Sequence, residues 1–335
     1  MNAFVMKIKK LFCILPVIAV SCTSEPLAEQ RANMADIRFT IDDSAVTYTK
    51  TTSSNFEGLA TDIQIAVYAP SGQLYTSGEI TGNSLTLSVP VEIGGYSVAA
   101  LVNGTASLGS CVTFDKTTGL LSALTSNGLS NNELEMFGSV SNQTFHAGKS
   151  CTVPVTRIPA KVEIDKIVNM IPSKPDFTVK SVYLINVNTS SSVTGVVSSA
   201  VWKQQRKYVS TETDVVRYTY DAVGSKLDYG KSYETPHYFY CYANPTTSDT
   251  SSPTWSPRYT RLVVEADYNG HTCYYPINIV GAGNVLLSGY KYVITQLTIT
   301  GPGSDDPDVP ISRTDASFNV SVQDWGNGFS QTINY

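Results

Sequence analysis

The clearest feature of the sequence is a repeated alternation of apolar and polar residues over short segments. Apolar residues at every second position lie on one face of a β-strand. Five segments show this pattern best: Ile37, Phe39 and Ile41; Ile63, Ile65 and Val67; Leu85, Leu87 and Val89; Cys273, Tyr275, Ile277 and Ile279; Phe318, Val320 and Val322. Turn-forming residues separate them, and Asn269-Gly270 predicts a tight type I′ hairpin. No sustained amphipathic helical pattern is present. The chain is therefore predicted to be all-β, of the β-sandwich class.

Two interruptions predict how the chain is divided. One strand ends and another begins within residues 154–161, which predicts an N-terminal domain of residues 23–157 and a C-terminal domain of residues 158–335. Residues 301–310 contain three prolines and three aspartates. They predict an extended, solvated strap that cannot join a central sheet. The segment 312–335 is then expected to be tethered to the C-terminal domain rather than embedded in it.

Residues 1–22 have the pattern of an export signal. Lysines precede the apolar run 11–20, which is too short to cross a bilayer but has the length of a signal-peptide core. Because the lysines follow Met6 directly, we expect translation to start at Met6. Ala19-Val-Ser-Cys22 resembles the bacterial lipobox, with Ala where Leu is preferred, and predicts a lipidated, palmitate-bearing Cys22. The alternative is an ordinary secretory signal with Cys22 incidental.

Four cysteines remain if Cys13 leaves with the signal and Cys22 carries lipid. Two lie in each half of the chain: Cys111, Cys151, Cys241 and Cys273. Disulfides within each half, Cys111 with Cys151 and Cys241 with Cys273, are the simplest pairing in an oxidising envelope. The alternative is free, buried thiols that act as small apolar side chains.

Charge and motif content exclude several functions. The chain has 23 Lys and Arg against 28 Asp and Glu, a net charge of −5, which argues against nucleic-acid binding. No glycine-flanked catalytic serine, zinc-protease, Cys-x-x-Cys or Rossmann motif is present. We therefore predict no enzymatic activity, no cofactor and no metal site. A zinc site from His237, Cys241, His271 and Cys273 is the weak alternative, since flat strands rarely supply structural zinc ligands.

One strand is rich in aromatic residues. Tyr238, Tyr240 and Tyr242 share a face, and such a face could stack against sugars. A covered face is the commoner arrangement for aromatic strands. The sugar platform supports an alternative function, a monomeric glycan-binding surface lipoprotein.

Several short motifs follow one another along the mature chain, and their order is as informative as the motifs themselves. They include Phe39-Thr-Ile-Asp42, Met136-Phe-Gly-Ser-Val140, Val155-Thr-Arg157, Tyr240-Cys-Tyr-Ala-Asn-Pro245, Leu297-Thr-Ile-Thr-Gly-Pro-Gly-Ser304, Pro307-Asp-Val-Pro310 and Val320-Ser-Val-Gln-Asp-Trp325. With the lipoprotein leader, this series resembles the fimbrillin-like subunits of the type V pili of Bacteroidales. The sequence departs from that pattern in two places, with Ser288-Gly289 where Arg-Asn is common and Lys50 where Arg is common.

The resemblance implies two transthyretin-like β-sandwich domains in tandem and a structural role in a fimbrium at the outer membrane and cell surface. It implies export as a lipoprotein held in outer-membrane lipid through Cys22. A surface trypsin-like protease then cuts the chain, and subunits polymerise by donor-strand exchange with copies of themselves or with other pilus subunits. Anchor and tip adhesin roles are alternatives within the same family.

Particular residues match those roles. The removable first strand is placed at about residues 36–50, with Ile37, Phe39 and Ile41 facing inward. Matched position favours cleavage at Lys50, with Arg38 and Arg31 as alternatives; the other possibility is that the strand stays, as in an anchor. The candidate donor-strand residues follow the strap: Phe318, Val320, Val322, Phe329, Ile333 and Tyr335. Their alternative is a final strand that folds back onto its own domain.

Overall fold

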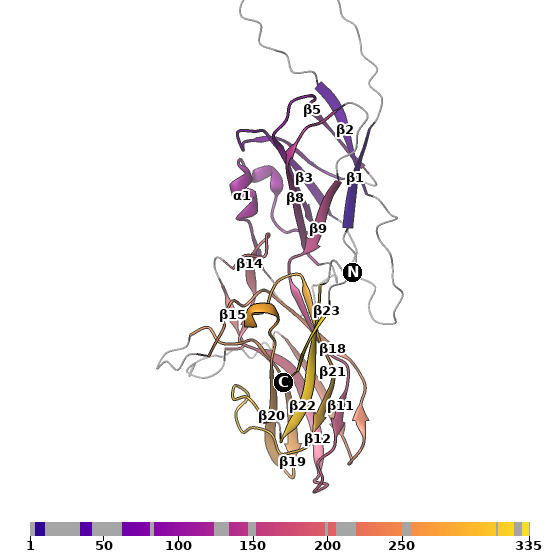
Figure 1. Ribbon diagram of the computed structural model, residues 1–335, viewed down its shortest axis with the longest axis vertical. Coiled ribbons are helices and arrows are strands. Elements are labelled where there is room, and N and C mark those ends of the chain that lie inside the picture. The colour runs from indigo at the N-terminus through magenta and orange to yellow at the C-terminus, as the bar shows by residue number, and fades with distance from the viewer. Residues whose placement is uncertain are drawn as a thin grey trace, which may run out of the picture. The chain divides into compact units, whose positions relative to one another are not determined.

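Strands make up most of the ordered structure. The computed structural model describes residues 4–10, 34–41, 62–80, 84–123, 134–146, 152–197, 200–205, 219–249, 256–312, 314–324 and 330–334. Among these residues the one α-helix, α1 (Phe114–Thr118), is a single turn, and no helix is long and apolar enough to span a membrane. The all-β prediction is confirmed. The chain divides into two units, one drawn from residues 2–120 and 135–156, the other from 121–134 and 157–335 (Figure 1).

The first unit is an antiparallel strand assembly around one apolar core. Its strands follow the path β4 (Leu74–Glu79), β3 (Ile63–Tyr68), β6 (Tyr96–Val102), β8 (Met136–Gln143), β9 (Thr152–Arg157), β1 (Phe4–Lys10), β2 (Met34–Ile41) and β5 (Ser84–Pro90). Ile65 and Val98 supply the core from β3 and β6, and Val89 and Val153 supply it from β5 and β9. The predicted alternation therefore places its apolar residues on the face that is buried.

The opposite face of β3 is buried as well, which the alternation did not predict. Gln64 is 7% exposed because its amide nitrogen donates to the Ala106 carbonyl at 3.0 Å and its amide oxygen accepts the Leu108 N–H at 2.8 Å. The 3₁₀ turn η2 (Leu108–Ser110) thus covers this face of the strand. Tyr68 packs edge-to-face on Phe114 of α1, with ring centroids 5.4 Å apart.

The second unit contains two main sheets. One follows the path β17 (Ser232–Tyr233), β11 (Ile167–Asn169), β21 (Tyr290–Ile299), β10 (Ala160–Ile164) and β18 (His237–Cys241). From β21 it continues to β22 (Ala316–Asp324) and then β23 (Ser330–Asn334). The other sheet has the order β16 (Tyr220–Lys226), β12 (Phe177–Ile185), β19 (Arg261–Tyr268) and β20 (His271–Asn278). Asn269 (φ 52°) and Gly270 (φ 83°) join β19 to β20, which confirms the predicted hairpin.

Short elements complete this unit. β7 (Leu121–Ala123) pairs with β14 (Ser190–Ser192), β13 (Val187–Asn188) pairs with β15 (Trp202–Lys203), and η3 (Ala282–Asn284) precedes β21. The hydroxyl of Ser122 in β7 contacts the hydroxyl of Tyr242, which is fully buried. The segment 121–134 is therefore part of the unit that holds most of the C-terminal half.

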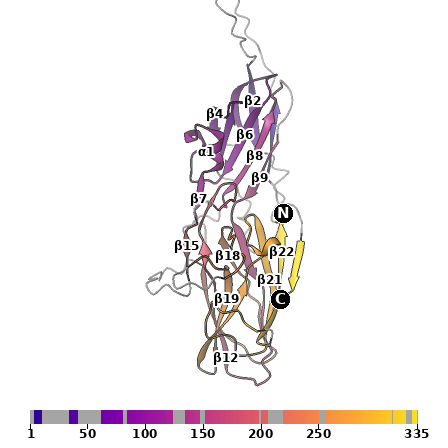
Figure 2. The same cartoon turned by 60° about the vertical axis from the view of Figure 1, so that its left-hand side comes forward.

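The structure corrects the prediction for the C-terminal segment. β22 runs antiparallel along β21, with Val320 opposite Ile294 and Val322 opposite Tyr292. Val320 and Val322 are buried, and Figure 2 shows β22 and β23 as neighbouring yellow strands. The prediction that residues 312–335 are merely tethered is wrong for β22, because its apolar face completes the core of its own sheet. The strap is not fully solvated either, since Asp308 is 1% exposed.

Candidate functional site

The N-terminal strand β2 lies within the first unit's strand assembly. It pairs with β5 in a register that sets Ala35 opposite Val89 and Ile37 opposite Leu87. Leu87 and Val89 are buried in the core. Partners across an antiparallel ladder lie on the same face of the sheet. Positions 35 and 37 therefore belong to the core-facing side, the placement that a removable first strand needs; its removal stays a prediction.

A second N-terminal strand, β1, fills the position between β9 and β2 (Figure 1). Met6 pairs with Val153 on one side and with Ile41 on the other. β1 comes from the predicted leader, where the charge and apolar pattern predicts an export signal and not a strand. The N-terminal segments together supply two adjacent strands between β9 and β5.

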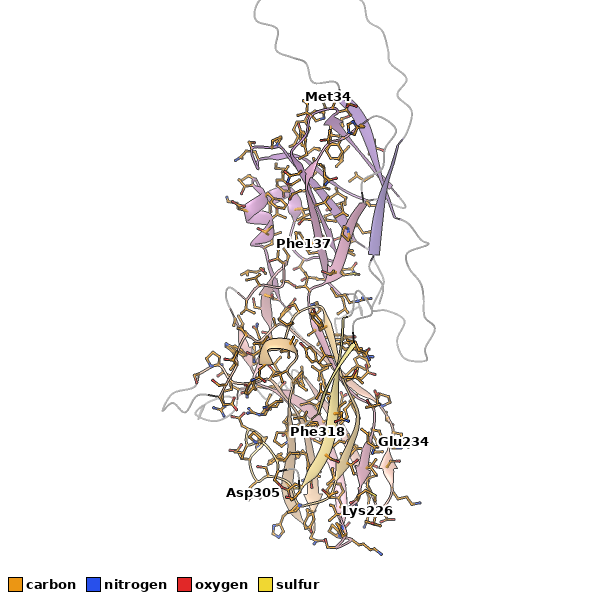
Figure 3. All side chains as sticks on the ribbon, viewed as in Figure 1. Met34, Phe137, Lys226, Glu234, Asp305 and Phe318 are labelled. Carbon is orange, nitrogen blue, oxygen red and sulfur yellow. The ribbon has the colours of Figure 1, made fainter. Side chains whose placement is uncertain are left out.

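An aromatic cluster contacts the first residue of β2. Tyr75 of β4 donates its hydroxyl hydrogen to the Met34 sulfur at 3.6 Å. Its ring packs edge-to-face on Tyr96 at 6.0 Å, and Tyr96 packs on Phe145 at 5.7 Å. Figure 3 labels Met34 at this end of the strand. No pattern in the sequence predicts this cluster, because its members lie far apart in the chain.

Of the residues predicted to take part in processing, the structure describes only Arg38. Cys22, Arg31 and Lys50 lie outside the described residues. Arg38 lies within β2, where its backbone is opposite Thr86 on one side and Lys9 on the other. Proteases need accessible, unpaired backbone. The ladder therefore disfavours Arg38 as a cleavage site, and Lys50 and Arg31 stay predictions.

The structure gives different outcomes for the predicted donor-strand residues. Phe318, Val320 and Val322 lie on β22, which is paired on both edges in its own domain, so the folded-back alternative holds for these three. Ile333 lies on β23, opposite Val320, and β23 is the last strand on this side of the sheet. Phe329 and Tyr335 lie outside the described residues. The donor hypothesis is accordingly limited to β23 and the flanking residues Phe329 and Tyr335.

The described cysteines are free thiols. Cys111, Cys241 and Cys273 are buried and unpaired by disulfides, so the predicted Cys241–Cys273 bridge is not formed. Burial raises the pKa of the Cys241 thiol to about 12 and that of Cys273 to about 11. Cys151, the predicted partner of Cys111, lies outside the described residues. The free-thiol alternative describes Cys241 and Cys273, which behave as small apolar side chains.

The aromatic strand does not present a stacking platform. Tyr240 is 6% exposed and Tyr242 is fully buried. Tyr238 is half-buried, and the Lys161 ammonium lies over its ring at 4.6 Å from the centroid. The glycan-binding alternative loses its main support, because the rings that would stack on a sugar are already covered.

One of the two histidines in the weak zinc alternative, His237, is engaged elsewhere. His237 Nδ1 lies 2.7 Å from an Asp221 carboxylate oxygen, and its Nε2 lies 3.0 Å from the Tyr233 hydroxyl. Within the described ranges, no group of three or more His, Cys, Asp or Glu residues could hold a metal ion. The zinc hypothesis gains nothing from this geometry.

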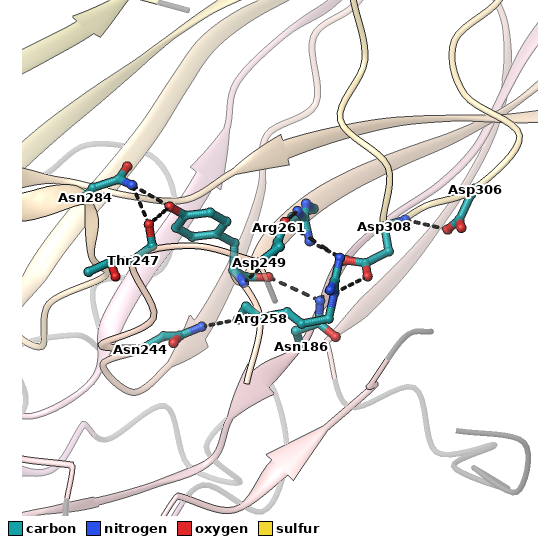
Figure 4. Close-up of polar contacts among 10 residues, drawn as sticks. Asn186, Asn244, Thr247, Asp249, Arg258, Arg261, Asn284, Asp306 and Asp308 are labelled. Carbon is teal, nitrogen blue, oxygen red and sulfur yellow. Dashed lines mark hydrogen bonds and ion pairs between the residues drawn. The ribbon is translucent and has the colours of Figure 1, made fainter. Parts of the chain in front are cut away.

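The strap takes part in a buried ionic network that no pattern in the sequence predicts (Figure 4). Arg258 donates from Nε to Asp308 at 2.5 Å, and Arg261 donates from Nη1 to the same carboxylate. The Asn186 side-chain amide nitrogen donates a hydrogen bond to Asp308 at 3.0 Å. Asp249 accepts a hydrogen bond from the other terminal nitrogen of Arg261. Burial raises the pKa of Asp308, and the two guanidinium groups oppose that rise. The network attaches the strap to β19 and the segment before it.

Comparisons with known proteins support the fold. No protein-family model matches the chain, and no curated protein matches its sequence. Thirty-three chains of solved structures do match. A candidate cell adhesion protein from Bacteroides eggerthii is 15% identical, with a TM-score of 0.59 over 80% of this chain and 90% of that one.

Two further structures extend the likeness. A fimbrilin from Porphyromonas gingivalis is 15% identical, with a TM-score of 0.57 over 83% of this chain and 95% of that one. A candidate cell adhesion protein from Parabacteroides distasonis is also 15% identical, with a TM-score of 0.56 over 98% of this chain and 99% of that one. The chain therefore has the fold of a fimbrilin, as the resemblance in sequence motifs implied.

Proposed function

We propose that this protein is a structural, non-catalytic subunit of a cell-surface fimbria that polymerises by strand exchange. The fold shared with a fimbrilin over most of both chains supports this role. A fold alone does not define a function, so the proposal depends on the strand arrangement of the first unit. Its partners are other copies of the chain or other pilus subunits.

The observation that carries the proposal is the position of β1 and β2. Both come from the start of the chain, and they lie between β9 and β5, beside the core residues Val153 and Val89. Strands that can leave without breaking the rest of the chain are suited to exchange. Their loss would leave unpaired backbone groups on β9 and β5, a template for strand addition.

The proposed maturation empties the two positions in order. Removal of the leader before Cys22 takes β1 away, and lipid on Cys22 holds the precursor in the outer membrane. A trypsin-like cut after Lys50 then takes β2. Neighbouring strands lie about 4.8 Å apart, so the opening from β9 to β5 would span three spacings, or about 14 Å.

The proposed donor is the end of the neighbouring chain. β23 ends its sheet, and Phe329, Ile333 and Tyr335 all occupy odd-numbered positions of this stretch, with polar residues between them. Main-chain hydrogen bonds would provide affinity in such an exchange, and the alternating side chains would set the register.

A protease-triggered assembly assay tests the proposal. Purified chain lacking residues 1–22 is treated with limiting trypsin, and oligomers are followed on gels without boiling. We expect a ladder from the wild type and none from Lys50→Ala, with the uncut wild type as a second control. A wild-type chain that is cut after Lys50, stays folded and remains monomeric would refute strand exchange.

A further inference from the structure

β20 is the end strand of its sheet, and its outer edge is covered by the strap. The Tyr274 N–H donates to the Ser304 carbonyl and the Ser304 N–H donates to the Tyr274 carbonyl, both at 2.8 Å. Backbone groups alternate in direction along a strand, so Pro276 has the same orientation as Tyr274. Proline has no N–H to offer a neighbouring strand. This edge therefore combines an occupied bridge with a position that cannot donate.

The strap approaches β20 so closely that a side chain at one strap position would collide with the strand. Gly303 has a φ of +78°, and a Cβ there would lie 2.7 Å from the Tyr274 carbonyl oxygen. The Tyr275 hydroxyl donates to the Gly301 carbonyl at 2.7 Å. Gly303 thus lets the strap backbone lie directly against the strand edge, and the Gly301 carbonyl holds the strap there through the Tyr275 hydroxyl.

The ionic network locks the other end of the strap. The Asp308 side chain is fully buried and accepts hydrogen bonds from Arg258, Arg261 and Asn186 (Figure 4). Arg261 begins β19, the strand that pairs with β20. The lock therefore fixes the strap to the same sheet whose edge the strap covers.

The sheets do not close this edge by themselves. Next to the end of the strap, an open groove of about 210 Å³ separates β20 from β22. It is lined by Pro276, Asn278, Pro310, Ile311, Ser312, Ala316 and Phe318. The gap between the strands therefore persists where the strap ends.

We infer that residues 301–310 form an edge guard, locked by Asp308, that prevents β20 from accepting a strand from a second copy of the chain. An uncovered edge strand is a template for uncontrolled pairing, and a covering loop is one way to block it. The consequence for assembly, that strand addition is confined to the first unit, rests on the proposed function. The guarding of β20 does not.

Two independent variants release the guard. Asp308→Asn removes the charge that both arginines bind, and Asp305→Asn is its control, since Asp305 is an exposed carboxylate of the same strap (Figure 3). Gly303→Ala forces the strap away from Tyr274 without touching the network. Its control is Gly270→Ala, where φ is also positive but nothing lies within 4 Å of the added Cβ.

The full chain, without protease, is assayed by hydrogen exchange at the Tyr274 amide and by light scattering over a range of concentrations. In Asp308→Asn and Gly303→Ala we expect exchange to speed up roughly tenfold or more and concentration-dependent oligomers to form. Both controls should stay protected and monomeric.

Folded variants that keep wild-type protection, or that lose it and remain monomeric, would overturn the inference. If Asp308→Asn fails to fold, Gly303→Ala decides the question alone. Because no cleavage is involved, failure of the proposed polymerisation leaves this result unaffected.

Discussion

Gly138 is the position where a single methyl group should do most damage. It lies on β8, and a Cβ there would be 1.9 Å from the Pro154 carbonyl oxygen, 2.8 Å from its carbonyl carbon and 3.0 Å from the Val155 Cα. All three are backbone atoms of β9, so no side-chain rotation relieves the contact. A non-bonded carbon and oxygen need more than 3 Å, so Gly138→Ala must displace one strand by over about 1 Å.

Overpacking of a tight core costs about 1–3 kcal/mol, and a contact with rigid backbone belongs at or above the upper end. We therefore expect Gly138→Ala to lower the free energy of unfolding by about 3 kcal/mol or more, measured by urea denaturation. Gly109→Ala is the control, because its nearest contact is the Ser77 hydroxyl at 3.2 Å, which can rotate away. A Gly138→Ala protein within about 1 kcal/mol of wild type would refute the close approach of β8 and β9.

Three further predictions concern titration, thiols and the ionic network. Burial, together with a hydrogen bond to Glu163 and the charge of Glu163, raises the pKa of Asp165 from 3.8 to about 6, so the folded state binds the extra proton. The contribution of Asp165 to stability should therefore be lost as pH rises from 3.8 to about 6. Urea titrations of Asp165→Asn and wild type should differ by this slope, and equal slopes would contradict it. Cys241 and Cys273 should resist iodoacetamide at pH 7 in the native protein and react after denaturation, with rapid native labelling as the contrary result. Arg261→Met leaves Asp308 with one fewer cation and should cost about 3–5 kcal/mol of unfolding free energy; an unchanged denaturation midpoint would contradict the network.

Sequence patterns predicted the features that depend on neighbouring residues, namely strands, their core-facing sides and tight turns. The alternation at Ile63, Ile65 and Val67 identified a strand and its core-facing side, and Asn269-Gly270 identified a hairpin because both residues tolerate positive φ. The second buried face of β3 was missed, because it depends on a segment some forty residues further along the chain that covers Gln64.

The strap shows why composition misleads where partners are distant. Three aspartates among prolines indicate a solvated linker, and nothing near Asp308 in the sequence reveals a buried carboxylate. Its cations lie about fifty residues upstream, Arg261 at the first position of β19 and Arg258 in the segment just before that strand. A buried charge is stable only with such partners, so its burial could be recognised only from the tertiary structure.

The same reasoning applies to the C-terminal strands. Phe318, Val320 and Val322 have the alternation that a donor strand needs, but any core strand of a sandwich has it too. Pairing with β21 assigned them to their own domain. The sequence pattern predicts that these residues form a strand, but only the observed pairing with β21 shows where that strand lies.

The central claim is that the N-terminal strand of each subunit is absent from the assembled polymer. The first residue of chains recovered from purified, detergent-resistant polymers can be determined by mass spectrometry. The account predicts chains that begin at Thr51 and lack Met34–Ile41. Polymers whose chains still carry Met34–Ile41 would contradict it.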